Sequence, residues 1–135
     1  MFQTKSLVVR QFCQSDLDSL YQLCQNPNVM KWVGDGQILS REQCQIWIDK
    51  QNKDSDRPVL GTFAVLIKES DEFIGYAGIV KDPALYSNEE NKQAPEIIYA
   101  LKQEIWGQGY ARELVPALKN ALGIPIPLRG FGMKR

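Results

Sequence analysis

The chain has 135 residues, and its sixteen basic and sixteen acidic side chains cancel to a formal net charge of zero. A chain of this length forms one domain and can bury a core without metals or disulfides. Balanced charge gives no overall field that would favour nucleic acid or an anionic membrane surface, so neither is expected as a partner. Because no apolar run is as long as a membrane span and the first residues lack a signal-peptide hydrophobic stretch, we expect a cytoplasmic protein.

The cysteine and histidine content argues against two kinds of chemistry, metal binding and catalysis by an imidazole. Cys13, Cys24 and Cys44 show no Cys-x-x-Cys spacing, and the chain contains no histidine. We therefore expect no metal site and no mechanism that needs an imidazole base. Cys24 falls in a helical apolar pattern and is expected to pack as a small apolar residue, and no cysteine is assigned a catalytic role.

The first part of the chain predicts one strand followed by two helices. A β-branched run over residues 6–12 predicts the strand. Residues 15–18 offer a serine oxygen and, three residues later, an acid, which predicts a capped helix that ends at Asn26-Pro27. A second helix is expected over residues 40–48, and the polar residues 51–57 predict a loop.

The middle of the chain predicts a β-hairpin. Residues 59–67 and 72–80 are two runs of strand formers on either side of a short polar turn, most simply an antiparallel pair. Three glycines inside these runs predict bulges or close packing of helices onto the sheet. They are Gly61, Gly75 and Gly78. Residues 82–93 are charged and are expected to form an exposed connection.

A strand, a glycine turn and a helix follow one another over residues 96–122. Residues 96–101 are rich in strand formers, and the apolar spacing after residue 110 predicts a helix, with a bend at Pro116. Gly107 and Gly109 stand between them. This order brings unpaired backbone N–H groups to the positive end of a helix, where an anion such as a pyrophosphate can bind. An ordinary tight turn is the alternative interpretation.

These residues resemble a known motif. Tyr99-Ala100-Leu101 followed by Trp106-Gly107-Gln108-Gly109-Tyr110-Ala111 resembles the acyl-CoA-binding motif of the GCN5-related N-acetyltransferase (GNAT) superfamily, in the branch of ribosomal-protein N-terminal acetyltransferases (RimJ/RimL type). The order Leu-x-x-Arg-x-Phe, Asp-Leu and Asn-Pro-x-Val near the start of the chain is similar to the opening of the same branch. The resemblance implies an α+β fold, an α/β/α sandwich whose mixed, mostly antiparallel sheet is flanked by helices.

The resemblance covers residues 1 to about 123. Relatives continue into another strand, a further helix and a closing hairpin, whereas here two prolines spaced by one residue make the last residues a poor central strand. We therefore expect an incomplete acetyltransferase domain over residues 1–123, lacking the C-terminal strands, and an atypical tail over residues 124–135.

The resemblance also implies a site for acetyl-CoA as co-substrate. Its pyrophosphate is expected on the amides of residues 107–111 and its pantetheine arm beside the strand, with the thioester carbonyl near the backbone N–H of Leu101. The implied cofactor-binding residues are Tyr99, Ala100, Leu101, Trp106, Gly107, Gln108, Gly109, Tyr110, Ala111 and Arg112. For Arg112 two interpretations stay open, a contact with a CoA phosphate and a solvent-facing helix residue.

Glu96 is the candidate catalytic base, since related acetyltransferases use a carboxylate on this strand directly or through water to deprotonate the amine. A solvated residue at the rim of the sheet is the alternative. In related enzymes the region after the first helix overhangs the acceptor site, which would place Trp32 and Gly34-Asp35-Gly36 near substrate. Core packing for Trp32 and a plain turn for the glycines are the alternatives.

Two function classes follow from the resemblance. The first is an N-acetyltransferase that moves acetyl from acetyl-CoA to a primary amine, on a protein N-terminus or a small molecule, by direct attack. The second is a truncated, catalytically weak or inactive domain that binds CoA or dimerises. An uncovered strand edge and helix face predict a homodimer, and a monomer whose own tail covers them is the alternative.

Overall fold

In the described part of the chain, five strands form one antiparallel sheet in the order β1-β2-β3-β4-β5. The computed structural model describes residues 2–31, 36–53, 61–80 and 96–122. The strands are β1 (Phe2–Gln3), β2 (Leu7–Arg10), β3 (Gly61–Ile67), β4 (Glu72–Val80) and β5 (Glu96–Leu101). The helices are α1 (Leu17–Cys24), α2 (Pro27–Met30), α3 (Arg41–Lys53) and α4 (Tyr110–Leu122), with the 3-10 turns η1 (Gln14–Asp16) and η4 (Gln103–Ile105).

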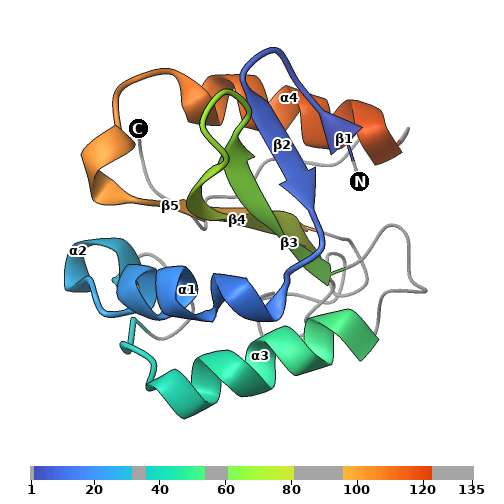
Figure 1. Ribbon diagram of the computed structural model, residues 1–135. Coiled ribbons are helices and arrows are strands. Elements are labelled where there is room, and N and C mark those ends of the chain that lie inside the picture. The colour runs from blue at the N-terminus through green and yellow to red at the C-terminus, as the bar shows by residue number, and fades with distance from the viewer. Residues whose placement is uncertain (1, 32–35, 54–60, 81–95, 123–135) are drawn as a thin grey trace, which may run out of the picture.

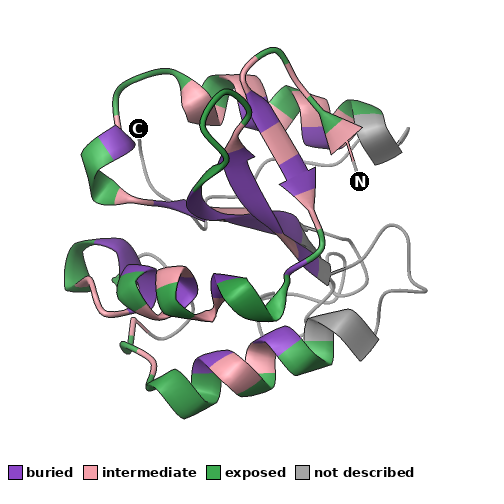
Figure 2. Ribbon diagram, in the orientation of Figure 1, coloured by how far each residue is buried: buried purple, intermediate pink, exposed green. Residues whose placement is uncertain are grey.

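Helices cover both faces of the sheet, as Figure 1 shows, with α4 on one face and α1 to α3 on the other. Figure 2 shows the buried residues on the strands and on the inner faces of the helices. The cluster on the α4 side includes Leu7, Val65, Ile97, Leu114 and Leu118. The cluster on the other side includes Leu20, Cys24, Cys44, Ile48 and Tyr76. Burying apolar residues in two layers of this kind is what makes an α/β/α sandwich stable, and the predicted fold class is confirmed.

The predicted cap of the first helix is wrong. The chain enters α1 through the 3-10 turn, and the carboxylate of Asp16 accepts from the backbone N–H of Cys13 at 2.7 Å. Arg10 binds the same carboxylate through two nitrogens, at 2.8 and 3.0 Å, and this pairing allows Asp16 to be only 5% exposed. Asp18, the acid predicted to complete the cap, pairs instead with Arg41 of α3. The ion pair with Arg10 comes from a neighbouring strand, which a local capping pattern does not include.

Two other helix boundaries follow local rules. Asn26 caps α2, its side chain accepting from the Asn28 N–H at 2.9 Å, and Pro27 occupies the first turn, so the predicted break at Asn26-Pro27 is confirmed. Ser40 and Gln43 form reciprocal bonds at the start of α3, of 3.1 and 2.8 Å. The loop predicted over residues 51–57 is wrong at its start, because α3 continues to Lys53. Gln51 and Lys53 are good helix formers, so polarity alone does not end a helix there.

The predicted hairpin is confirmed and contains a bulge at Ile74. Val65 pairs with Gly75 while Leu66 pairs with Phe73, so Ile74 is the extra residue on β4. A Cβ on Gly75 would lie 2.0 Å from the carbonyl oxygen of Ala100. The glycine is therefore required because β5 approaches so closely, and the alternative expectation, packing of a helix onto the sheet, is wrong for this glycine.

The helix predicted after the glycine turn is α4, which runs without interruption through Pro116. Leu114 and Leu118 are buried against the sheet, as their spacing predicts. Expectations for Trp32, Gly34 and Asp35, for residues 82–93 and for the tail over 124–135 lie outside the described residues. Among the helices that are described, none combines the length and apolar character needed to cross a bilayer.

Candidate functional site

The glycine turn leaves open space above its backbone. Gly107 and Gly109 have φ of 84° and 89°, which glycine adopts without the steric cost that a Cβ brings. A Cβ built on either one would have no heavy atom within 4 Å, and both residues are exposed. Their requirement is thus conformational, unlike that of Gly75, and a ligand can approach the main chain directly.

This open backbone meets the N-terminus of α4. The first turn of a helix has N–H groups without intrahelical acceptors, and its partial positive charge favours an anion. Here Glu113 N donates to Gly109 O at 3.2 Å, so the first turn of the helix starts from the second glycine. Tyr110 and Ala111 are half-buried against the α4-side core and hold this end of the helix in place. The geometry can hold a phosphate-sized anion.

Side chains within the loop fix its conformation. Trp106 donates from its indole nitrogen to the carbonyl oxygen of Leu101 at 2.9 Å, and it packs against both core clusters. Gln108 donates from Nε2 to the carbonyl oxygen of Glu104 at 3.2 Å. Both side chains are thus hydrogen-bonded to main-chain carbonyl groups just before the glycine turn. The indole of Trp106 thus positions the turn, and its predicted contact with a cofactor stays a prediction.

The strand before the loop, β5, is the outermost strand of the described sheet. Lys102 N donates to Ile74 O at 2.7 Å, and Leu101 lies opposite Gly75. Because residues of an antiparallel strand alternate in direction, Tyr99 and Leu101 turn their main-chain groups away from β4. The side chains of Ala100 and Leu101 are buried in opposite core clusters. Any cofactor contact at these two residues therefore involves their backbone.

The remaining predicted residues are placed less fully. Glu96 begins β5 opposite Val80, and its side chain lies outside the described part of the structure, so its role as base stays a prediction. Arg112 is exposed and forms no ion pair with a described residue, which leaves both of its interpretations open. In the described ranges, no group of three or more His, Cys, Asp or Glu side chains is placed to hold a metal ion.

One residue that positions α4 was not found from the sequence. Glu113 accepts hydrogen bonds from the Thr4 hydroxyl and, at 2.6 Å, from the Ser6 N–H in the turn between β1 and β2. Burial acts to raise the pKa of Glu113, but these hydrogen bonds outweigh it and the pKa lies below its ordinary value. No local signal identifies this contact, since its partners are more than a hundred positions away in the chain.

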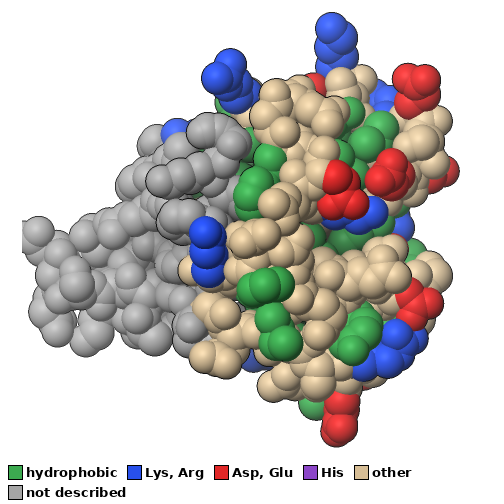
Figure 3. All heavy atoms as spheres, turned by 90° about the vertical axis from the view of Figure 1, so that its left-hand side faces the viewer, with side chains coloured by type: hydrophobic (Ala, Val, Ile, Leu, Met, Phe, Trp, Pro, Cys, Tyr) green, Lys and Arg blue, Asp and Glu red, His purple; other side chains and the backbone are tan. Residues whose placement is uncertain are grey.

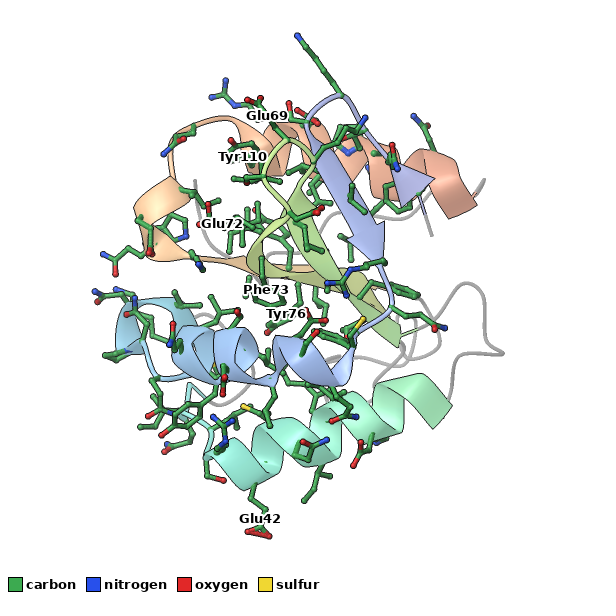
Figure 4. The ribbon with its side chains drawn as sticks, in the orientation of Figure 1. Glu42, Glu69, Glu72, Phe73, Tyr76 and Tyr110 are labelled. Carbon is green, nitrogen blue, oxygen red and sulfur yellow. The ribbon has the colours of Figure 1, made fainter. Side chains whose placement is uncertain are left out.

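The opposite face of the sheet is closed by aromatic packing. Trp47 contacts Tyr76 edge-on, with ring centroids 4.7 Å apart, and donates to the Thr62 hydroxyl at 3.1 Å. Figure 4 shows Phe73 and Tyr76 between the sheet and α1, whereas Tyr110 lies on the α4 side. Cys24 is buried as predicted, and burial raises its pKa and that of Cys44. Thiols of this kind are poor nucleophiles.

Comparison with known proteins covers most of the chain. A family model described as Acetyltransferase (GNAT) domain matches residues 6–123. The uncharacterized N-acetyltransferase p20 of Bacillus licheniformis is 31% identical over 115 residues, which are 85% of this chain and 61% of that protein. The uncharacterized N-acetyltransferase YnaD of Bacillus subtilis (strain 168) is 26% identical with the same coverage. The chain spans about three fifths of the length of these curated relatives.

Solved structures share the fold at low sequence identity. A putative GNAT-family acetyltransferase from Bordetella pertussis gives a TM-score of 0.70 at 19% identity, covering 90% of this chain and 71% of the other. A Salmonella typhimurium acetyltransferase, described as modifying the N-terminal serine of a 50S ribosomal subunit protein, gives 0.65 at 20%, covering 89% and 65%. RimL, a ribosomal alpha-N-protein acetyltransferase solved in complex with coenzyme A, gives 0.63 at 19%, covering 87% and 63%.

Proposed function

The chain belongs to the GNAT acetyltransferase family, a family of acyltransferases, and we propose that it transfers the acetyl group of acetyl-CoA to a primary amine. The observation that carries this proposal is the open turn at Gly107 and Gly109 at the start of α4. The acceptor amine is a protein N-terminus or a small molecule. An N-terminal serine is the acceptor described for the Salmonella neighbour, and another neighbour is a spermidine N-acetyltransferase from Vibrio cholerae.

The residues present suit acetyl-CoA. Backbone N–H groups of residues 107–111 and the dipole of α4 would bind the pyrophosphate, and the outer edge of β5 would lie beside the pantetheine arm. Bound there, acetyl-CoA supplies an activated acyl group as a thioester. Trp106 and Gln108 hold the loop in its binding conformation before the ligand arrives, which reduces the entropic cost of binding.

The proposed chemistry is a direct transfer. Glu96 accepts a proton from the acceptor ammonium, directly or through water, and the neutral amine attacks the thioester carbonyl carbon. The new C–N bond forms as the C–S bond breaks. The sulfur leaves with the electron pair of that bond and takes the second proton, which the nitrogen loses as it becomes an amide. No acyl-cysteine is needed, in keeping with the complete burial of Cys24 and Cys44.

Acetyl transfer is tested by following the release of free CoA thiol from acetyl-CoA. The acceptors are a peptide with an N-terminal serine, the same peptide blocked at its N-terminus, and spermidine. We expect acceptor-dependent release with the free peptide or with spermidine, and none with the blocked peptide. If CoA binds but no acceptor in a wider amine panel increases release, the chain is the CoA-binding or dimerisation domain of the second class.

The predicted homodimer is tested separately, by measuring the oligomeric state in solution. Light scattering at micromolar concentration distinguishes a dimer from a monomer. A monomer that also fails to bind a hydrophobic dye would show that the strand edge and the α4 face are already covered, and the dimer prediction would be wrong.

A further inference from the structure

A side-chain hydrogen-bond network joins the segment before the glycine turn to the turn between α1 and α2. The side-chain oxygen of Gln103 accepts from the side-chain nitrogens of Asn26, at 3.0 Å, and Asn28, at 3.1 Å. In Figure 1, α2 lies beside the loop that leads from β5 to α4, at the same end of the sheet. The contact therefore links the helices on one face of the sheet to the loop that leads into α4 on the other face.

The donor side of this contact is held in place by α2. The side-chain oxygen of Asn26 caps α2 on Asn28 N, which turns the amide nitrogen of Asn26 toward Gln103. The backbone oxygen of Asn26 accepts from the N–H groups of Val29 and Met30, each at 3.0 Å. The direction of the donated bond thus depends on α2 being formed.

The acceptor side is connected to the glycine turn. Gln103 belongs to η4, and its backbone oxygen accepts from Trp106 N at 3.1 Å. Trp106 in turn donates to Leu101 O and directly precedes Gly107. A displacement of Gln103 therefore moves the residue that sets the entry into the turn.

The network is made of neutral amide side chains. Figure 3 views this side of the molecule and shows acidic, basic and apolar side chains interspersed over the described surface, without a large area of one sign. Gln103 and Asn28 are exposed and Asn26 is half-buried, so water competes for the bonds. Each of these hydrogen bonds therefore contributes only modestly in free energy.

We propose that Gln103 is a positioning residue that couples binding of the CoA pyrophosphate at the glycine turn to the conformation of α2. The inference rests on the proposed function, because it takes CoA as the ligand of the turn. Coupling between two sites is reciprocal, so CoA binding stabilises α2, and an intact α2 contact strengthens CoA binding. The network thereby links the cofactor loop to the helices on the other face.

The test uses CoA itself as the probe, titrated by calorimetry into the wild type, Gln103→Ala and a matched control, Gln22→Ala. Gln22 is an exposed glutamine of α1 whose side chain forms no hydrogen bond with a described residue. We expect Gln103→Ala to raise the Kd for CoA about three- to tenfold, the loss of one or two partly exposed bonds, with the melting temperature nearly unchanged. The control should bind as the wild type does.

Amide hydrogen exchange provides the readout that separates coupling from simple support. CoA should slow exchange at Val29 and Met30 in the wild type and should fail to do so in Gln103→Ala. Asn28→Ala should weaken CoA binding less than Gln103→Ala, and the double variant should bind no worse than Gln103→Ala alone, because one network is lost in both.

These experiments distinguish failure of the proposed function from failure of the proposed coupling. A wild type that does not bind CoA overturns the proposed function and this inference with it. A wild type that binds CoA, together with a Gln103→Ala variant of unchanged Kd or with undiminished protection of α2, overturns the coupling alone. A lower melting temperature with unchanged CoA affinity has the same consequence, since it reveals a merely structural role.

Discussion

On the α1–α3 face of the sheet, large side chains close the structure: Trp47 packs on Phe12 and Tyr76 and donates to Thr62. On the α4 face, the loop before the helix depends on backbone conformation, with two glycines at positive φ and side chains that grip nearby main-chain groups. A close-packed region leaves no room for a ligand, whereas a backbone held in an open turn does. The candidate site therefore lies where main-chain groups, and not side chains, face the space that a ligand would occupy.

The largest effect on stability is expected at Gly75, the glycine that is required by close packing of two strands. In Gly75→Ala the new Cβ would lie 2.0 Å from Ala100 O, so β4 and β5 must separate, and we expect a loss of about 3 kcal/mol or more in unfolding free energy. The matched variant Gly109→Ala meets no atom and should lose about 1–2 kcal/mol, from its positive φ alone. Urea unfolding measures both. Equal losses would contradict the distinction between the two glycines.

The anchor of α4 predicts a pH dependence. The pKa of Glu113 lies below its ordinary value of 4.5, so its stabilising contribution is complete above that value and is lost as pH falls through the lower, folded-state pKa. Glu113→Gln should be less stable than the wild type at neutral pH, by about 1–2 kcal/mol for charge-assisted bonds to a half-buried group. Chemical unfolding from pH 7 to pH 3 should show the difference narrowing, and a difference that widened on acidification would contradict the assignment.

A smaller effect is expected on the packed face. Tyr76 is almost fully buried, and its hydroxyl makes no hydrogen bond with the described residues. Tyr76→Phe removes a buried hydroxyl that has no hydrogen-bond partner among the described residues, and it should raise the free energy of unfolding by up to about 1 kcal/mol, with unchanged affinity for CoA. Denaturant unfolding and calorimetry on one preparation test this. Lost CoA affinity in a stable Tyr76→Phe variant would mean that the packed face also contributes to the site.

The smallest effect concerns the thiols. Cys13 is exposed, while Cys24 and Cys44 are buried. A maleimide should therefore modify Cys13 alone in the native protein, and the modified protein should keep its affinity for CoA and its rate of thiol release from acetyl-CoA. Peptide mass mapping identifies the modified site. Loss of turnover with CoA binding intact would be evidence for an acyl-cysteine and against direct transfer.

Structural features that depend on residues close together in the sequence could be predicted. Contacts between separate elements of the fold could not. The hairpin, β5, the glycine turn and α4 follow from alternation, glycine positions and helical spacing. The bonds of Glu113 to the β1–β2 turn and the contact of Gln103 with Asn26 join segments far apart in the sequence. The pairing of Arg10 with Asp16 spans only six residues, but it joins the end of a strand to the start of a helix and so lies outside a helix-capping pattern. Ala100 and Leu101 were correctly placed on β5, but their burial, which leaves only their backbone for a ligand, required the structure.

The central claim, that the open turn at the start of α4 binds the CoA pyrophosphate, is tested most directly by calorimetric titration of CoA into the wild type and Gly109→Val. The added side chain would project into space that is open in the wild type. We expect CoA binding to the wild type and at least about a tenfold loss of affinity in the variant, equivalent to about 1.4 kcal/mol, while circular dichroism shows that it stays folded. CoA affinity that is unchanged in a folded Gly109→Val variant would contradict the assignment.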